Sequence, residues 1–217
     1  MQERLRRDQP GGGSQQRRSN NAFFSTRGII MANVAIVFHS GYGHTKAVAE
    51  SVQKGAASVA GSNVTLVSVT DAEQHWDTLA KADAIIFGAP TYMGSVSADM
   101  KKFMEASSKV WFTQGWKDKL AAGFTVSGAY SGDKLSTLQQ FMLFAGQHSM
   151  LWASQGIMPG FNTSKGSIED LNRVGSYSGL MVQANLDQGP EGIAPSDFKT
   201  AEAFGARIAT LAKRFAA

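Results

Sequence analysis

A short apolar segment, a turn of small polar residues and a helical pattern follow one another over residues 34–50, and they constrain the fold more than any other part of the chain. The apolar run at 34–38 is too short and too uniform for a half-exposed strand, so it predicts a central parallel strand. In the turn, Ser40 and Thr45 supply hydroxyls, while Gly41 and Gly43 relax the backbone. Because successive N–H groups and the positive end of a helix meet there, the turn is suited to a phosphate group.

Known phosphate-binding loops differ from this turn in specific residues. It contains no Gly-Lys-Ser/Thr and is therefore not a Walker A loop. It is not the dinucleotide fingerprint either, because Lys46 stands where the third glycine would be needed. The spacing Ser40-x-x-Gly43-x-Thr45 resembles the phosphate loop of flavodoxin-like proteins, which bind FMN. An ordinary strand–helix turn remains open at this point.

Composition excludes several classes of protein. The chain has 217 residues, of which 43% are hydrophobic, so one domain with a substantial core is expected. It contains no cysteine, which excludes a disulfide scaffold and a thiolate metal site, and we expect no metal. No apolar run is long enough to predict a membrane span. The absence of cysteine fits a cytoplasmic setting.

The charge is concentrated at the amino end. The whole chain carries a net charge of +4, and residues 1–30 account for all of it with six Arg and two acidic residues. The remainder is neutral, so we expect no nucleic-acid partner. Residues 1–30 are low in complexity and predict a disordered leader or extension ahead of a folded domain at 31–217. An organellar transit peptide is the alternative, because this segment is rich in Arg and poor in acidic residues.

Beyond the first turn, apolar runs alternate with helical patterns. We predict strands at 34–38, 64–69, 84–88, 121–126 and 150–153. We predict helices near 44–58, 97–108 and 134–147, and a last one at 197–215 with Ser196 as its N-cap. This alternation predicts an α/β fold, a doubly wound five-stranded parallel sheet of order 2-1-3-4-5. Its ligand crevice would lie between the carboxyl ends of the first and third strands.

Two more loops follow predicted strands at the same edge of this sheet. Residues 88–97 combine two glycines with hydroxyls and with flat or soft apolar side chains, and residues 127–133 have the same character. Each loop alone could be a plain connection. Three such loops at one edge favour a ligand site.

The stretch at 84–111 contains G-x-P-T-x-x-G, then a K-x-F-x-E helix and a Trp. It resembles the flavodoxin-like NAD(P)H:quinone oxidoreductases, the tryptophan-repressor-binding-protein-like family, and the resemblance covers about residues 33–215. It implies a flavodoxin-like fold with bound FMN. It also implies a two-electron, ping-pong reduction of a quinone, with NADPH or NADH as the co-substrate.

The resemblance also assigns site residues. The FMN phosphate would contact Ser40, Gly41, Tyr42, Gly43, His44 and Thr45. The flavin ring would contact Pro90, Thr91, Tyr92, Met93, Gly94 and Ser95, and its far edge Ser127, Gly128 and Gly132. His148 matches a catalytic-site His of the family, and Trp111 an aromatic beside the same cleft. Structural roles for His148 and Trp111 remain open.

Some residues depart from the family pattern. Tyr130 replaces a smaller residue and could shade the flavin, and Tyr92-Met93 leaves the choice between NADPH and NADH open. Two other functions also stay open: a one-electron flavodoxin-type carrier, and a non-enzymatic partner-binding protein on the same fold. The segment after the second predicted strand is short and lacks an insertion that the tetrameric members have, which leaves the assembly open between a homodimer and a homotetramer.

Overall fold

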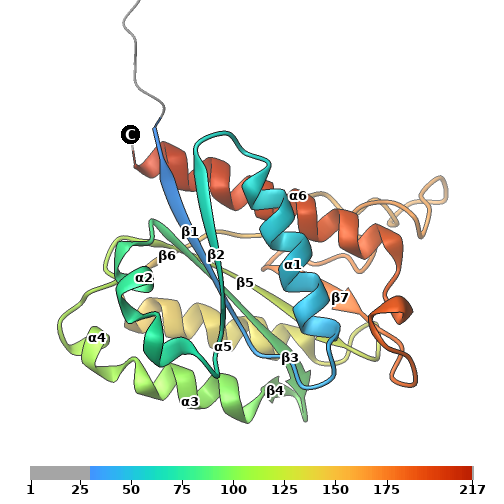
Figure 1. Cartoon of the computed structure of the whole chain (residues 1–217). Helices are drawn as coiled ribbons and strands as arrows, with labels where there is room; N and C mark the ends of the chain where they lie inside the picture. The colour runs from blue at the N-terminus through green and yellow to red at the C-terminus, as the bar shows by residue number, and fades with distance from the viewer. Residues whose placement is uncertain (1–29, 217) are drawn as a thin grey trace, which may run out of the picture.

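A parallel β-sheet lies between two layers of helices in the computed structural model, which describes residues 30–216 (Figure 1). The predicted leader at 1–30 lies outside these residues, except for Ile30. The strands are β1 (Ala32–Phe38), β2 (Ser62–Ser68), β3 (Ala84–Tyr92), β4 (Ser95–Val96), β5 (Leu120–Ser127), β6 (Leu151–Trp152) and β7 (Leu180–Gln183). The helices are α1 (His44–Ala57), α2 (Trp76–Lys81), α3 (Ala98–Ala106), α4 (Ser108–Phe112), α5 (Lys134–Gln147) and α6 (Pro195–Phe215). Two short 3₁₀ turns are η1 (Ala72–Gln74) and η2 (Pro190–Gly192).

The strand order confirms the predicted topology. The sheet runs β2-β1-β3-β5-β6, which is the order 2-1-3-4-5 when β5 and β6 are counted as the fourth and fifth strands. Side chains of β1 enter both cores in alternation: Val34 and Ile36 pack with α1 and α6, whereas Ala35 and Val37 pack with α2, α3 and α5. Figure 1 shows α1 and α6 together on one face of the sheet. Burial on both faces explains why the strand is uniformly apolar.

The prediction of five strands was incomplete, because the fifth position is shared by two strands. β6 pairs with the start of β5, at Leu120 and Ala121, and β7 pairs with its end, from Phe124 to Ser127. Residues 153–179 lie between β6 and β7 as an irregular loop. β4 forms an additional antiparallel hairpin with the end of β3. Both additions lie at the carboxyl edge of the sheet, where the predicted loops meet.

The last helix begins differently from the prediction. It starts at Pro195, and Ala194 is the residue before it, so Ser196 is not an N-cap. The Ser196 hydroxyl instead donates to the carbonyl of Ile168, at 2.9 Å. Proline suits the first position of a helix because its missing N–H would have no partner there.

Helices α1 and α6 pack backbone against backbone. A Cβ atom added at Gly205 would overlap the carbonyl oxygen of Val52, and one added at Gly55 would overlap that of Glu202. Only glycine allows this approach. The contact fixes α1, whose first turn belongs to the site described below.

Candidate functional site

The turn before α1 directs backbone N–H groups towards one point. The hydroxyl oxygen of Ser40 accepts hydrogen bonds from the N–H groups of Gly43, at 3.1 Å, and Lys46, at 3.2 Å. Gly43 adopts a left-handed conformation with φ of 92°. His44 and Thr45 open α1, so their N–H groups have no carbonyl one turn back. The positive end of the helix and these donors together make this turn a candidate anion-binding loop.

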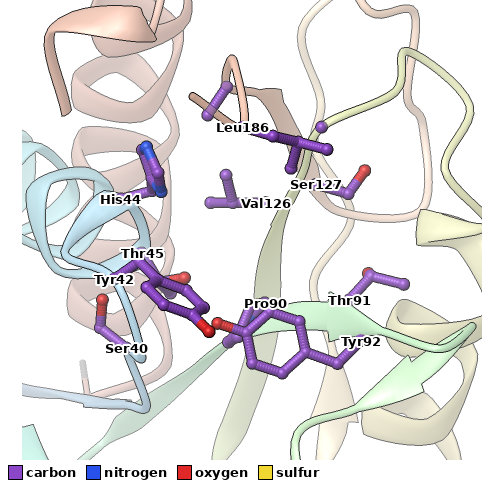
Figure 2. Close-up of a pocket in the computed structure, with 12 residues that line it drawn as sticks. Ser40, Tyr42, His44, Thr45, Pro90, Thr91, Tyr92, Val126, Ser127 and Leu186 are labelled. Carbon is purple, nitrogen blue, oxygen red and sulfur yellow. The ribbon is translucent and has the colours of Figure 1, made fainter. Parts of the chain in front are cut away.

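A pocket opens directly beside this loop, at the carboxyl ends of β1, β3 and β5 (Figure 2). It encloses about 640 Å³, counted with its open mouth. Its lining residues are Ser40, Tyr42, His44, Thr45, Pro90, Thr91, Tyr92, Val126, Ser127, Gly128, Ala184 and Leu186. All three predicted loops therefore contribute to one pocket. The set contains no carboxylate, which suits an anionic ligand.

Two tyrosines stand at the pocket mouth. Tyr42 from the first loop is 80% exposed, and Tyr92 at the end of β3 is partly exposed. Their ring centroids are 6.4 Å apart at an interplanar angle of 69°, and Figure 2 shows the two rings pointing towards one another. Burial, followed by the neighbouring Tyr42, raises the pKa of Tyr92. Tyr92 therefore stays neutral near pH 7, and both rings offer flat apolar surface.

The side chain of Thr91 lines the pocket, but its hydroxyl is engaged in the core. Its Oγ1 lies 2.8 Å from the Oγ1 atoms of both Thr125 and Thr137. These three hydroxyls link β3, β5 and α5 below the pocket. Thr91 therefore offers a ligand its methyl group and backbone, with the hydroxyl serving the scaffold.

The outer part of the second predicted loop forms the tip of the β3–β4 hairpin. Met93 and Gly94 have φ values of 48° and 75°, and the Met93 side chain is fully exposed. Ser95 donates from its hydroxyl to Gln140 Oε1, at 3.0 Å. These three residues do not line the pocket, whereas Pro90, Thr91 and Tyr92 do.

The loop 184–194 forms a wall that sequence reasoning missed. It follows β7 and contributes Ala184 and Leu186 to the pocket. His44 joins this wall to the turn before α1, because its Nε2 lies 2.8 Å from the carbonyl of Gln188 and 3.1 Å from that of Gly189. Two carbonyl neighbours require His44 to donate from Nε2. His44, predicted only as a phosphate contact, therefore also anchors a distant segment.

A buried ammonium group supports the third predicted loop. Ser127 and Gly128 line the pocket, and Gly132 folds back with φ of 52°, close to the Ser127 hydroxyl and outside the lining. Lys134 is fully buried, and its Nζ donates to Ser127 Oγ at 2.8 Å and to the carbonyl of Ala129 at 2.6 Å. Burial lowers the pKa of Lys134 to about 8.

An ion pair behind this loop joins two segments far apart in the sequence. Arg173 donates to Asp197 through Nε at 2.9 Å and Nη2 at 2.7 Å, and both side chains are 2% exposed. Arg173 Nη1 also donates to the Tyr130 hydroxyl, at 2.7 Å. Burial raises the pKa of Asp197, and Arg173 acts in the opposite direction. Tyr130, a departure from the family pattern, is thereby held to the scaffold.

His148 and Trp111 also lie outside the pocket lining. His148 follows the last turn of α5, whereas Lys134 begins that helix under the pocket, so the two are about 20 Å apart along the helix axis. His148 is 1% exposed, with Nε2 at 2.9 Å from Ser107 Oγ and its ring against Trp116. Burial lowers its pKa to about 4. Trp111 lies in α4 and is partly exposed.

Comparison with known proteins identifies the family. A family model described as a flavodoxin domain matches residues 35–156. The chain belongs to the flavodoxin-domain family. Flavodoxin FldP of Pseudomonas aeruginosa is 39% identical over 85% of this chain and 98% of its own length. Such a domain implies a bound flavin.

Further similar proteins are named either as flavodoxins or as quinone oxidoreductases. A flavodoxin, WrbA-like protein from Agrobacterium tumefaciens has a solved structure with 41% identity and a TM-score of 0.67, over 84% of this chain and 98% of that one. Quinone-oxidoreductase QR2 of Triphysaria versicolor is 29% identical over 85% of this chain and 97% of its own length. An NAD(P)H dehydrogenase (quinone) of Trichlorobacter lovleyi is 32% identical over 56% of this chain and 70% of its own length. This flavodoxin-domain protein therefore resembles both flavodoxins and quinone oxidoreductases. No helix within residues 30–216 has the length and apolar character to cross a membrane.

Proposed function

We propose that residues 31–217 form one FMN-binding domain that reduces quinones by two electrons at the expense of NADPH or NADH. The observation that carries the proposal is that a candidate anion-binding loop lies directly beside a pocket with flat apolar walls. The loop around Ser40 suits the FMN phosphate, and the residues at the ends of β3 and β5 suit its ring. QR2 and the NAD(P)H dehydrogenase (quinone) relatives support quinone as the substrate class.

The residues present fit FMN on the chemistry of their donors. Ser40 Oγ already accepts two N–H groups, which marks the position of an oxygen at the centre of the loop. The pocket lining contains hydroxyls, aromatic rings and aliphatic side chains, and no carboxylate that would repel a phosphate. Gly128 adjoins Leu186 in the lining, and Figure 2 shows Leu186 across the pocket from Tyr92. A planar ring with a polar edge matches these walls.

Bound FMN would supply the redox chemistry, by accepting a hydride from a nicotinamide and passing two electrons to a quinone. The chain's own part is to bind and to orient. Tyr42 and Tyr92 leave the pocket mouth accessible to a second planar substrate, since both are partly exposed. The lining includes no acid–base pair. His148, neutral and buried at the far end of α5, has no catalytic contact with this pocket in its own chain.

The test is spectroscopic. Purified protein is titrated with FMN, reduced anaerobically with NADPH or NADH, and then mixed with a simple benzoquinone. The proposal expects bound flavin absorbance to bleach with nicotinamide and to return with quinone. Failure of NADPH and NADH to bleach bound FMN would refute the reductase, and failure to bind FMN would refute the site.

A one-electron carrier is the second candidate, and the similarity to flavodoxin FldP favours it. The same sample distinguishes the two. A carrier would hold half-reduced flavin during stepwise reduction and would need a separate reductase, whereas a quinone reductase would react with the nicotinamide directly. Assembly into a homodimer or homotetramer stays a prediction, to be tested by sedimentation.

A further inference from the structure

We propose that Lys134 is a positioning residue for the flavin: a buried cation under residues 127–129 that favours the negative charge which the flavin gains on reduction. The inference rests on the proposed FMN site and adds a residue that tunes it.

The first argument is that the ammonium group of Lys134 has no carboxylate partner among the described residues. Lysine is almost never fully buried without one. Its hydrogen-bond partners are the Ser127 hydroxyl and the Ala129 carbonyl, both neutral. Both carboxylate oxygens of the nearby Asp197 are already engaged by Arg173, through its Nε and Nη2 atoms. Two cations therefore face one anion in this buried region, and a net positive charge remains.

The second argument is the position of this charge. Ser127 lines the pocket, and the Lys134 ammonium is one hydrogen bond below it. Ser127 Oγ in turn donates to the Ala129 carbonyl, at 3.1 Å, so the loop is organised around the ammonium. The Lys134 side chain itself is fully buried, and charges interact more strongly where water is excluded. An anion formed in the pocket would stabilise the ammonium, and the ammonium would stabilise that anion.

The lowered pKa of Lys134 supports this reading. Burial destabilises the charged form, with Arg173 adding to the effect and Asp197 opposing it. The groups that face Lys134 are Asp197 on α6, Arg173 in loop 153–179 and, beside Arg173, Tyr130 in its own loop. The charged form of Lys134 costs free energy while the neighbouring pocket is empty. A negative ligand in the pocket would lower that cost. Reduction of the flavin should therefore raise the pKa of Lys134 and draw in a proton between about pH 7 and 9.

The experiment compares Lys134→Gln with Lys119→Gln in the FMN-loaded full chain. Lys119 is the matched control: its half-buried Nζ also donates to backbone carbonyls, those of Ala80 and Ala82, but at the amino end of β5. The readouts are the FMN dissociation constant and the midpoint potential, measured with a chemical reductant and a reference dye at pH 7. Neither readout depends on nicotinamide or quinone.

The proposal expects Lys134→Gln to bind oxidised FMN within about threefold of the wild type and reduced FMN at least about tenfold more weakly. A tenfold change in that ratio lowers a two-electron potential by about 30 mV. Lys119→Gln should leave the potential unchanged. If Lys134→Gln weakened both forms of FMN equally, the potential would not move, and Lys134 would only hold the loop in place.

A second measurement uses the wild type and does not depend on the variant folding. Between pH 7 and 9 the potential should fall more steeply than that of free FMN, because reduction takes up the extra proton at Lys134. Parallel curves for free and bound FMN would overturn the inference. A wild type that binds FMN but ignores NADPH would refute the reductase and leave this test intact, whereas a wild type that binds no FMN would overturn both.

Discussion

Replacing Arg173 by methionine would leave the most deeply buried carboxylate of the site region without its partner. Arg173→Met removes two hydrogen bonds to Asp197, at 2.9 and 2.7 Å, and one to the Tyr130 hydroxyl. Methionine preserves much of the buried volume, so the loss is mainly electrostatic. Asp197 would keep only the backbone N–H of Gln183, at 3.2 Å, as a hydrogen-bond donor from its present set.

The expected cost at neutral pH is about 3–5 kcal/mol of unfolding free energy, because an uncompensated charge remains in a site that is 2% exposed. The cost should depend on pH. Burial already raises the pKa of Asp197, and losing Arg173 raises it further. The folded variant then holds a proton that the unfolded chain has released. Its stability relative to the wild type therefore falls as pH rises above the raised pKa that Asp197 has in the folded wild type, by up to about 1.4 kcal/mol per pH unit.

Urea unfolding at pH 5 and pH 8 measures both effects. Arg173→Met should be more strongly destabilised at pH 8 than at pH 5. The double variant Arg173→Met/Asp197→Leu is the control, since it removes both charges and should recover much of the loss. An equal loss at both pH values, or a double variant no more stable than the single one, would refute the argument.

Three further predictions concern packing, pH and binding. Gly205→Ala should lower the unfolding free energy by about 1–3 kcal/mol, because its methyl group overlaps the Val52 carbonyl. Gly146→Ala, in open space on α5, should raise that free energy by up to about 1 kcal/mol; urea unfolding of both variants tests the opposite signs. Burial lowers the pKa of His148 from its ordinary value of 6.5 to about 4. Between these two pH values the unfolded chain therefore binds a proton at His148 that the folded chain does not bind. Wild-type stability should therefore fall by about 3 kcal/mol as pH drops through that window, and unfolding of His148→Gln at pH 7 and 5 should lack this component. Ser40→Ala should weaken FMN binding by about tenfold in a fluorescence titration, because it removes a hydroxyl from the centre of the anion-binding loop.

The parallel sheet could be predicted because its signals are local. Each central strand is buried on both faces, and this produces a continuous apolar run that is visible without knowledge of its neighbours. β7 was missed for the opposite reason. It has four residues, follows the irregular segment 153–179, and acquires strand structure only by pairing with the end of β5.

The sequence by itself determined the anion-binding loop, because one contiguous segment, residues 40–46, supplies both its hydroxyl acceptor and its N–H donors. Only the tertiary structure decided what surrounds that loop. The pairing of Arg173 with Asp197 and the burial of Lys134 depend on how the segment 153–179 and α6 pack behind β5. Likewise, the length of α5 carries His148 away from the pocket to a site beside Trp116. Burial and charge pairing arise between segments that are distant in the chain, so no local pattern of residues predicts them.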